Sequence, residues 1–142
     1  MNHTKISIEK ISAYEATHYA VGSGSDAFTL RIGEFSPRLK DLFNVNKVSC
    51  GVFITAFNPF GSVQSGDANE TAHSKLRADL KKITSVILDG TGADPMGDWP
   101  PEASYLALGV EQETAEQLGR RFHQDAIVWS RSDAVPSLLF LR

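Results

Sequence analysis

Polar side chains with the chemistry to bind a ligand follow the most apolar stretch of the chain, Cys50–Phe57. A loop rich in Gly and Ser, residues 58–67, comes first, and a helical pattern with polar residues four apart comes next. Backbone N–H groups in such a loop and the partial positive charge of a helix N-terminus favour anions. Residues four apart share one helix face. The pattern predicts a site for a phosphate, a carboxylate or another polar small molecule, with these candidates: Asn58, Ser62, Asn69, His73 and Arg77.

A purely structural interpretation of this region stays open beside the functional one. Asn58-Pro59 can form a turn, and Asp67 can cap the helix with Glu70 three residues later. The polar helix face is then simply solvated. Each residue in the pattern has a structural role available, so the sequence does not choose between the two interpretations.

A second candidate region is Asp89–Pro101, which Gly and Pro interrupt so often that it is predicted to be a loop. Trp99 beside two prolines forms a rigid aromatic plate for stacking, or alternatively a lid over the core. Glu102 is the candidate general base or cation partner, and Ser104 follows it. Acidic residues here suit a hard cation such as Mg²⁺, but their spacing fits no calcium loop, and no metal site is predicted: Asp89, Asp94, Asp98 and Glu102.

Other motifs favour structural roles. Gly22–Ala27 matches the glycine pattern of dinucleotide-binding folds, but a strand-like run follows it instead of the helix that would face a pyrophosphate. Cys50 lies in an apolar run typical of a buried, inert thiol. The four histidines show no paired metal-ligand spacing. No catalytic motif appears, so the sequence leaves open whether the protein is an enzyme and which cofactor it would use.

Length and charge set the broad class. A chain of 142 residues suits one domain spanning residues 1–142. The formal charge of −3 and the scattered basic residues do not predict nucleic-acid binding. No apolar run approaches the roughly 20 residues of a membrane span, and the N-terminus lacks a signal-peptide pattern. We therefore expect a cytoplasmic protein without a membrane partner.

The apolar periodicity predicts helices and strands that would position both regions. Helices are expected over 7–16, from Ser36-Pro37 to about residue 44, from Asp67 and from about Glu111. Strands are expected over 17–21, 28–32, 50–57, 86–88, 105–108, 126–129 and 138–141. The fold class is α/β, with α+β as the alternative. It comprises a single mixed sheet with helices packed on it, two strand–helix–strand units, and N- and C-terminal hairpins.

An ordered series of residues resembles a bacterial family of small proteins, domain of unknown function 3293. The series comprises Ala13-Tyr14, Thr17, Tyr19, Phe28–Gly33, Ile54–Pro59, Asn69, Asp98-Trp99, Glu102, Ser104, Leu108-Gly109, Ala115, Leu118, Phe122, Gln124 and Ala126-Ile127. Three residues differ from those usual in the family, which more often has Trp or Tyr in place of Phe57, Pro in place of Ala103 and Gly in place of His123. The resemblance implies a stand-alone bacterial domain and supplies no activity.

Two functional hypotheses follow. In the first, the Asn58 loop and the Trp99–Ser104 segment meet around a pocket for a small polar or anionic ligand, such as a nucleotide or a phosphorylated metabolite. In the second, Trp99 and Phe60 form an exposed patch that binds a protein partner, as in a regulatory accessory module. Trp99 inside a concave cleft would favour the pocket, and Trp99 on a flat apolar patch would favour the interface.

Overall fold

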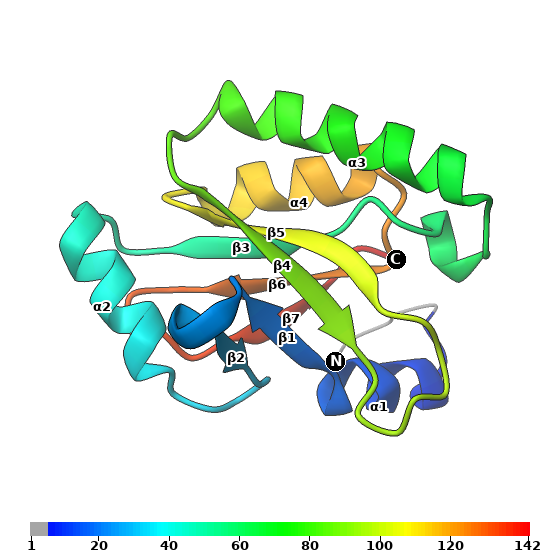
Figure 1. The fold of residues 1–142 in the computed structure, drawn as a ribbon, viewed down its shortest axis with the longest axis horizontal. Coiled ribbons are helices and arrows are strands. Elements are labelled where there is room, and N and C mark those ends of the chain that lie inside the picture. Colours follow the sequence, from blue (N-terminus) through cyan, green and yellow to red (C-terminus); the bar gives the residue numbers. More distant parts are fainter. Residues whose placement is uncertain (1–5) are drawn as a thin grey trace.

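The computed structural model describes residues 6–142, which form four α-helices and one seven-stranded sheet (Figure 1). The helices are α1 (Ile8–Ala16), α2 (Pro37–Asn46), α3 (Gly66–Lys81) and α4 (Gln112–Arg121). The strands are β1 (His18–Val21), β2 (Phe28–Leu30), β3 (Gly51–Ile54), β4 (Ile87–Ala93), β5 (Glu102–Leu108), β6 (Ala126–Ser130) and β7 (Ser137–Phe140). Two 3₁₀ turns are η1 (Gly24–Asp26) and η2 (Pro59–Gly61).

The sheet has the strand order β2-β1-β4-β5-β3-β6-β7, and every neighbouring pair is antiparallel. The expectation of a mixed sheet was therefore wrong. Both strand–helix–strand units exist, but each crossover skips a strand: β5 lies between β3 and β4, and β3 lies between β5 and β6. The connected strands run parallel without pairing. This interlocked βαββαβ core is a split βαβ, or ferredoxin-like, arrangement, and the terminal strands extend it on both edges.

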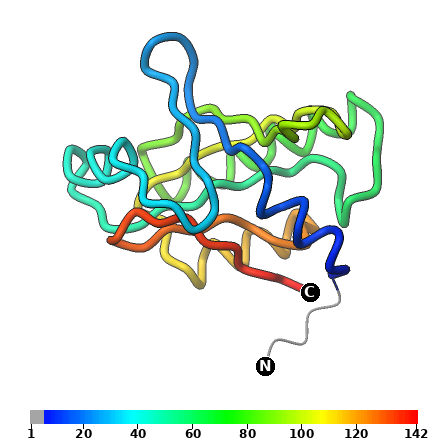
Figure 2. The backbone as a smooth tube through the Cα atoms, turned by 90° about the horizontal axis from the view of Figure 1, so that it is seen from below, coloured from blue at the N-terminus to red at the C-terminus, as the bar shows by residue number. Residues whose placement is uncertain are grey.

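The two hairpins predicted at the ends of the sheet are confirmed. In the first, Tyr19 pairs with Leu30 and Val21 with Phe28. In the second, β6 pairs with β7 along its length. Figure 2 shows that α1, which precedes the first hairpin, lies next to the C-terminal end of the chain.

Serine side chains begin three of the helices. Ser7 accepts a hydrogen bond from the N–H of Lys10, and Ser36 accepts one from Leu39 with Pro37 at the first helical position, as the sequence indicated. The predicted cap of α3 was wrong. Ser65, not Asp67, accepts a hydrogen bond from the N–H of Ala68, and Asp67 lies inside the first turn. A cap needs extended backbone, which Ser65 supplies with a ψ of 155°.

The strand β4 replaces part of a predicted loop. Residues 89–93 pair with both β1 and β5, so the irregular loop begins only at residue 94. The sequence did not predict this strand because it contains Gly90 and Gly92, and glycine is usually depleted from strand interiors. Glycine is needed at position 90 for a steric reason, because an added Cβ would lie 2.7 Å from the Phe53 ring and 2.9 Å from the carbonyl oxygen of Ala20.

Two apolar clusters cover the two faces of the sheet. On one face, α3 and α4 pack against alternate residues of β3, β5 and β6, among them Val52, Ala107 and Trp129 (Figure 1). On the other face, β1, β2 and α2 close over Phe53 and Leu106. Because the sheet curls, this second face is concave, and α2 fills only one end of it. The opposite end holds the candidate site.

Candidate functional site

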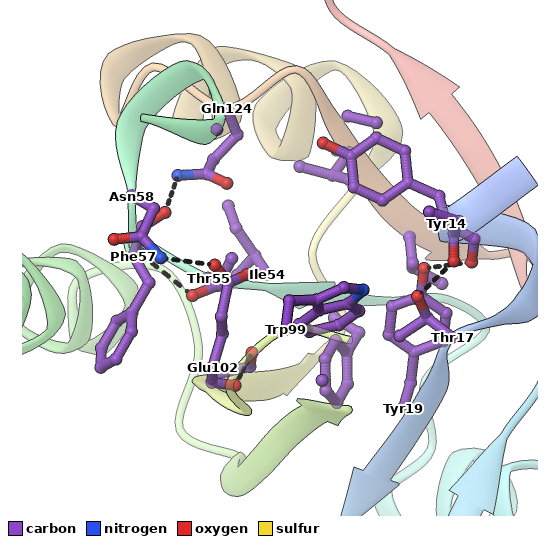
Figure 3. A pocket seen from close by; sticks show the side chains of 18 of the residues that line it. Tyr14, Thr17, Tyr19, Ile54, Thr55, Phe57, Asn58, Trp99, Glu102 and Gln124 are labelled. Atoms are coloured by element: carbon purple, nitrogen blue, oxygen red, sulfur yellow. Dashed lines mark hydrogen bonds between the residues drawn. The ribbon is translucent and has the colours of Figure 1, made fainter. Parts of the chain in front are cut away.

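A cavity of about 290 Å³ opens on the concave face of the sheet, at the end away from α2 (Figure 3). Its walls come from α1, β1, β3, η2, β4, the loop before β5, β5 and the segments around β6 and β7. The lining is mainly apolar with a few polar groups: Lys10, Ala13, Tyr14, Thr17, Tyr19, Phe53, Ile54, Thr55, Phe57, Asn58, Gly61, Val63, Gly92, Trp99, Pro100, Glu102, Ser104, Gln124, Ala126, Ile127, Val128 and Leu138. Such a composition is typical of small-molecule sites.

Small residues on the sheet create the hollow. Gly92 lies opposite Glu102 in the β4–β5 pairing, and Gly90 lies opposite Ser104. Alternation along a strand places these four residues on the same face of the sheet, where Gly92, Glu102 and Ser104 line the cavity and the Phe53 ring covers Gly90. Nothing except a methyl group of Thr17 lies within 4 Å of a Cβ built on Gly92. The absence of side-chain bulk at this row of the sheet therefore leaves space for a ligand.

Asn58 connects the loop after β3 to the rest of the site. It lies in the left-handed region (φ 47°), which Asn tolerates better than most residues. Its N–H donates to Asn69 Oδ1 at 3.0 Å, and its Oδ1 accepts from Asn69 Nδ2 at 3.1 Å and from the N–H of Gln64 at 3.2 Å. Its own Nδ2 donates to Glu102 Oε2 at 2.8 Å. Asn58 thereby fixes the position of the one carboxylate that lines the cavity.

Glu102 is half-buried and has no charged partner among residues 6–142. Within residues 6–142 its hydrogen-bond donor is the Asn58 amide, and no ion pair reaches it. Burial raises the pKa of the Glu102 carboxyl, and the hydrogen bond from Asn58 lowers it in part. A carboxyl with a raised pKa in an apolar cavity is a candidate to exchange a proton with a ligand or to pair with a cation.

Tyrosines from the N-terminal segment form the wall opposite Asn58 and Gln124 (Figure 3). The Tyr19 hydroxyl donates to the Tyr14 carbonyl oxygen at 2.7 Å, and the Tyr19 ring contacts Phe53 edge-on at 5.3 Å. Burial raises the pKa of Tyr14, and the charges of Asp125 and Glu102 raise it further. The charge of Arg142 lowers the pKa of Tyr14 in part.

An ion-pair cluster holds α1 against the rest of the domain. Lys10 Nζ contacts Asp125 Oδ2 and also donates to the Phe60 carbonyl oxygen at 3.3 Å. Arg142 Nη1 lies 2.7 Å from the other oxygen of Asp125, whose side chain is only 2% exposed. The Arg142 guanidinium also stacks over the Phe60 ring at 4.2 Å. Lys10 thus lines the cavity as a cation that is already engaged in an ion pair, and it shares the Asp125 carboxylate with Arg142.

Strained backbone gathers beside the cavity. Phe60 has φ 53° and His123 has φ 56°, a region that side chains with a Cβ adopt at a cost of about 1–3 kcal/mol. The two residues meet through a 2.6 Å hydrogen bond from the Phe60 N–H to the His123 carbonyl oxygen. Glycine adopts the left-handed backbone found at His123 without this cost.

The structure separates the residues that the sequence grouped. Asn58, Trp99, Glu102 and Ser104 line the cavity, and Asn69 lies behind Asn58 as its brace. Ser62 ends η2 outside the lining. His73 and Arg77 lie on the other face of the sheet, where His73 stacks on Tyr105 at 4.2 Å and Arg77 lies over the same ring at 5.7 Å.

Several lining residues were not among the predicted site residues, notably Tyr14, Tyr19, Gly92 and Gln124. Three of them occupy positions in the series that carried the family resemblance, and this was the signal available in the sequence. Gly92 carried no signal, because its role depends on strand pairing. Of the predicted acidic group, Glu102 alone lines the cavity. Across residues 6–142, no group of three or more His, Cys, Asp or Glu side chains is arranged to hold a metal ion.

Comparison with known proteins identifies the family. The family model described as "Protein of unknown function (DUF3293)" matches residues 54–127, from the end of β3 into β6. The chain belongs to this family. The DUF3293 match contains the Asn58 loop, the Trp99 loop and Glu102, and thus one side of the cavity; α1 and β1 supply the other side from outside the matched range. No curated protein and no solved structure matched the chain. In the described part of this DUF3293 protein, no helix has the length and apolarity needed to cross a bilayer.

Proposed function

We propose that this protein binds a small molecule in the cavity between α1, the Asn58 loop and the Trp99 loop. The observation that carries the proposal is the braced, half-buried Glu102 inside a hollow of about 290 Å³ with mainly apolar walls. A half-buried carboxyl lowers stability when it has no charged partner, and Glu102 has none among the described residues, so a ligand that pairs with it would offset this cost.

The lining indicates which ligands fit. The volume lies at the lower end of small-molecule sites, which favours a compact metabolite over a dinucleotide. An anionic or phosphorylated ligand fits less well than the sequence suggested, because Arg77 lies on the opposite face of the sheet and Lys10 is engaged in an ion pair with Asp125. A ligand with an apolar body and a group that hydrogen-bonds to Glu102 fits better.

Binding of a protein partner is the second candidate function. Its support is the exposure of apolar side chains around the cavity mouth: Val63 is 86% exposed and Phe60 is 44% exposed. Trp99, however, is half-buried and lines the hollow, which favours the pocket by the criterion set out from the sequence. A pull-down that recovers the same partner with wild type and with Trp99→Ala would argue against a partner surface that depends on Trp99.

A matched pair of substitutions on α1 tests the pocket. Ala13 lines the cavity from an exposed helical position, and Ala16 is exposed on the same helix away from the lining. Ala13→Trp fills the cavity with an indole ring, whereas Ala16→Trp adds the same ring to solvent. In a thermal-shift and NMR screen of small metabolites, compounds that bind wild type and Ala16→Trp should fail to bind Ala13→Trp. Equal binding to all three proteins would refute the pocket.

A further inference from the structure

We infer that the ligand of this cavity is a small organic cation, such as a primary amine or an amidine on an apolar skeleton. The inference rests on the proposed function and adds the charge and class of the ligand. In this arrangement the cationic group lies against the free oxygen of Glu102, and the apolar skeleton lies among the aromatic rings of the opposite wall.

Aromatic side chains supply the first reason. Tyr14, Tyr19, Phe53 and Trp99 all line the cavity, and they come from separate parts of the chain. Trp99 lies between Glu102 and the tyrosine wall (Figure 3). The faces of aromatic rings carry partial negative charge and attract cations within about 6 Å. Several such rings around one hollow are the arrangement that proteins use to bind ammonium groups.

The balance of charge supplies the second reason. Two side chains that line the cavity carry opposite formal charges, Lys10 and Glu102. Lys10 and Arg142 both pair with the carboxylate of Asp125, so Lys10 is already engaged in an ion pair with a buried acid. Glu102 meets only the neutral Asn58 amide among the described residues. A ligand that carries a positive charge can therefore pair with the Glu102 carboxylate.

Hydrogen-bond capacity supplies the third reason. A carboxylate accepts at both oxygens, and the Asn58 amide occupies one of them, Oε2. An ammonium or amidinium group donates several hydrogen bonds, and a charge-assisted bond to a carboxylate is about twice as strong as a neutral one. Asn58 itself is held by Asn69, so the acceptor is positioned before the ligand arrives.

Proton linkage gives the cation a signature that neutral ligands lack. Burial raises the pKa of Glu102, and a bound cation would lower it again. Binding of an amine near the pKa of Glu102 should release a proton, and the affinity should increase with pH through that range. The other titratable groups on the lining are Lys10, Tyr14 and Tyr19, and burial raises the pKa of both tyrosine hydroxyls. A neutral carbonyl ligand would instead favour protonated Glu102 and take up a proton.

The test uses probes that share one skeleton and differ in charge. Arylalkylamines such as 2-phenylethylamine would be titrated into the isotopically labelled full chain and followed by NMR, with the matching alcohols and carboxylates as controls. We expect the amine to bind at least about tenfold more tightly than its alcohol, with the carboxylate weakest. Glu102→Gln should remove most of this preference, and Glu113→Gln, on the exposed start of α4, should leave it unchanged.

A second variant separates the aromatic contribution from packing. Trp99→Leu keeps an apolar side chain and loses the ring, so the affinity for the amine should drop several-fold while that for the alcohol changes little. Should Glu102→Gln fail to fold, the ratio of amine to alcohol affinity in wild type and Trp99→Leu decides the question.

The outcomes separate this inference from the proposed function. Equal or tighter binding of the alcohol or carboxylate, abolished by Ala13→Trp, would overturn the cationic ligand and leave the pocket standing. The absence of any shift at cavity residues with all three probe classes would overturn both. An amine preference that persists in Glu102→Gln would also overturn the inference, because the carboxylate would then have no role in it.

Discussion

Substituting Gly90 by alanine should destabilise the protein, whereas the same substitution at Gly92 should not. Both residues lie in β4 and neither needs a positive φ, so the backbone accepts alanine at both. At Gly90 the new Cβ would lie 2.7 Å from the Phe53 ring and 2.9 Å from the carbonyl oxygen of Ala20. At Gly92 its closest neighbour would be Thr17 Cγ2 at 3.9 Å, an ordinary van der Waals contact.

The difference between the two variants can be estimated from these distances. Overpacking of this kind typically costs about 1–3 kcal/mol, and the loss of glycine returns about 0.5 kcal/mol through the unfolded chain. We expect Gly90→Ala to lose about 1.5 kcal/mol of the free energy of unfolding and about 5 °C in Tm for a chain of this size. Gly92→Ala should be unchanged or more stable by about 0.5 kcal/mol.

Urea unfolding followed by circular dichroism measures both variants under identical conditions. Gly90→Ala should cost less free energy of unfolding in a Phe53→Leu protein than in wild type, because the shorter side chain withdraws from the new methyl group. The carbonyl oxygen of Ala20 remains close, so part of the cost of Gly90→Ala should persist in the Phe53→Leu protein. A Gly90→Ala protein as stable as Gly92→Ala would refute the steric explanation for glycine in β4.

Three further predictions concern the groups around the cavity. Asn69→Ala removes three hydrogen bonds and leaves the Asn58 N–H without its partner, so urea unfolding should show a loss of about 2–3 kcal/mol. Lys10→Met leaves buried Asp125 with one cation fewer and should cost about 1–2 kcal/mol, with proteolysis near α1 becoming faster. Burial raises the pKa of Glu102 in the folded protein above its unfolded value, so its ionisation opposes folding as pH rises. Glu102→Gln should therefore match wild type at acidic pH and exceed it in free energy of unfolding towards neutral pH; a constant difference across pH would contradict this.

Much of the local structure could be predicted, because its causes are local. Ser36-Pro37 specifies a helix start by its own hydrogen bond and fixed φ, and the start at Ser7 has the same cause. The hairpins follow from alternating side chains around turns of Gly, Ser and Asp. The predicted N-cap of α3 was wrong because both Ser65 and Asp67 are good cap residues. Only the path of the preceding loop selects between them.

Part of the candidate site could be recognised from the sequence, because polar residues that follow strand ends are a local pattern. Asn58 and Glu102 were recognised as polar residues next to strand ends, and the structure joins them by a 2.8 Å hydrogen bond. His73 and Arg77 were assigned to the same site because they share a helix face with Asn69. That face is wide enough for Asn69 to reach the loop at one end of α3 while the other two reach Tyr105.

The sequence by itself determined the helices, most strands, the hairpins and the two loops that carry Asn58 and Trp99. These features depend on interactions between residues a few positions apart. The tertiary structure alone decided that each crossover skips a strand, that the sheet is antiparallel throughout, and that Gly92 and Ser104 leave a hollow opposite the tyrosines of the N-terminal segment. Pairing between distant strands depends on which partner best buries both faces, and that choice is a property of the whole chain.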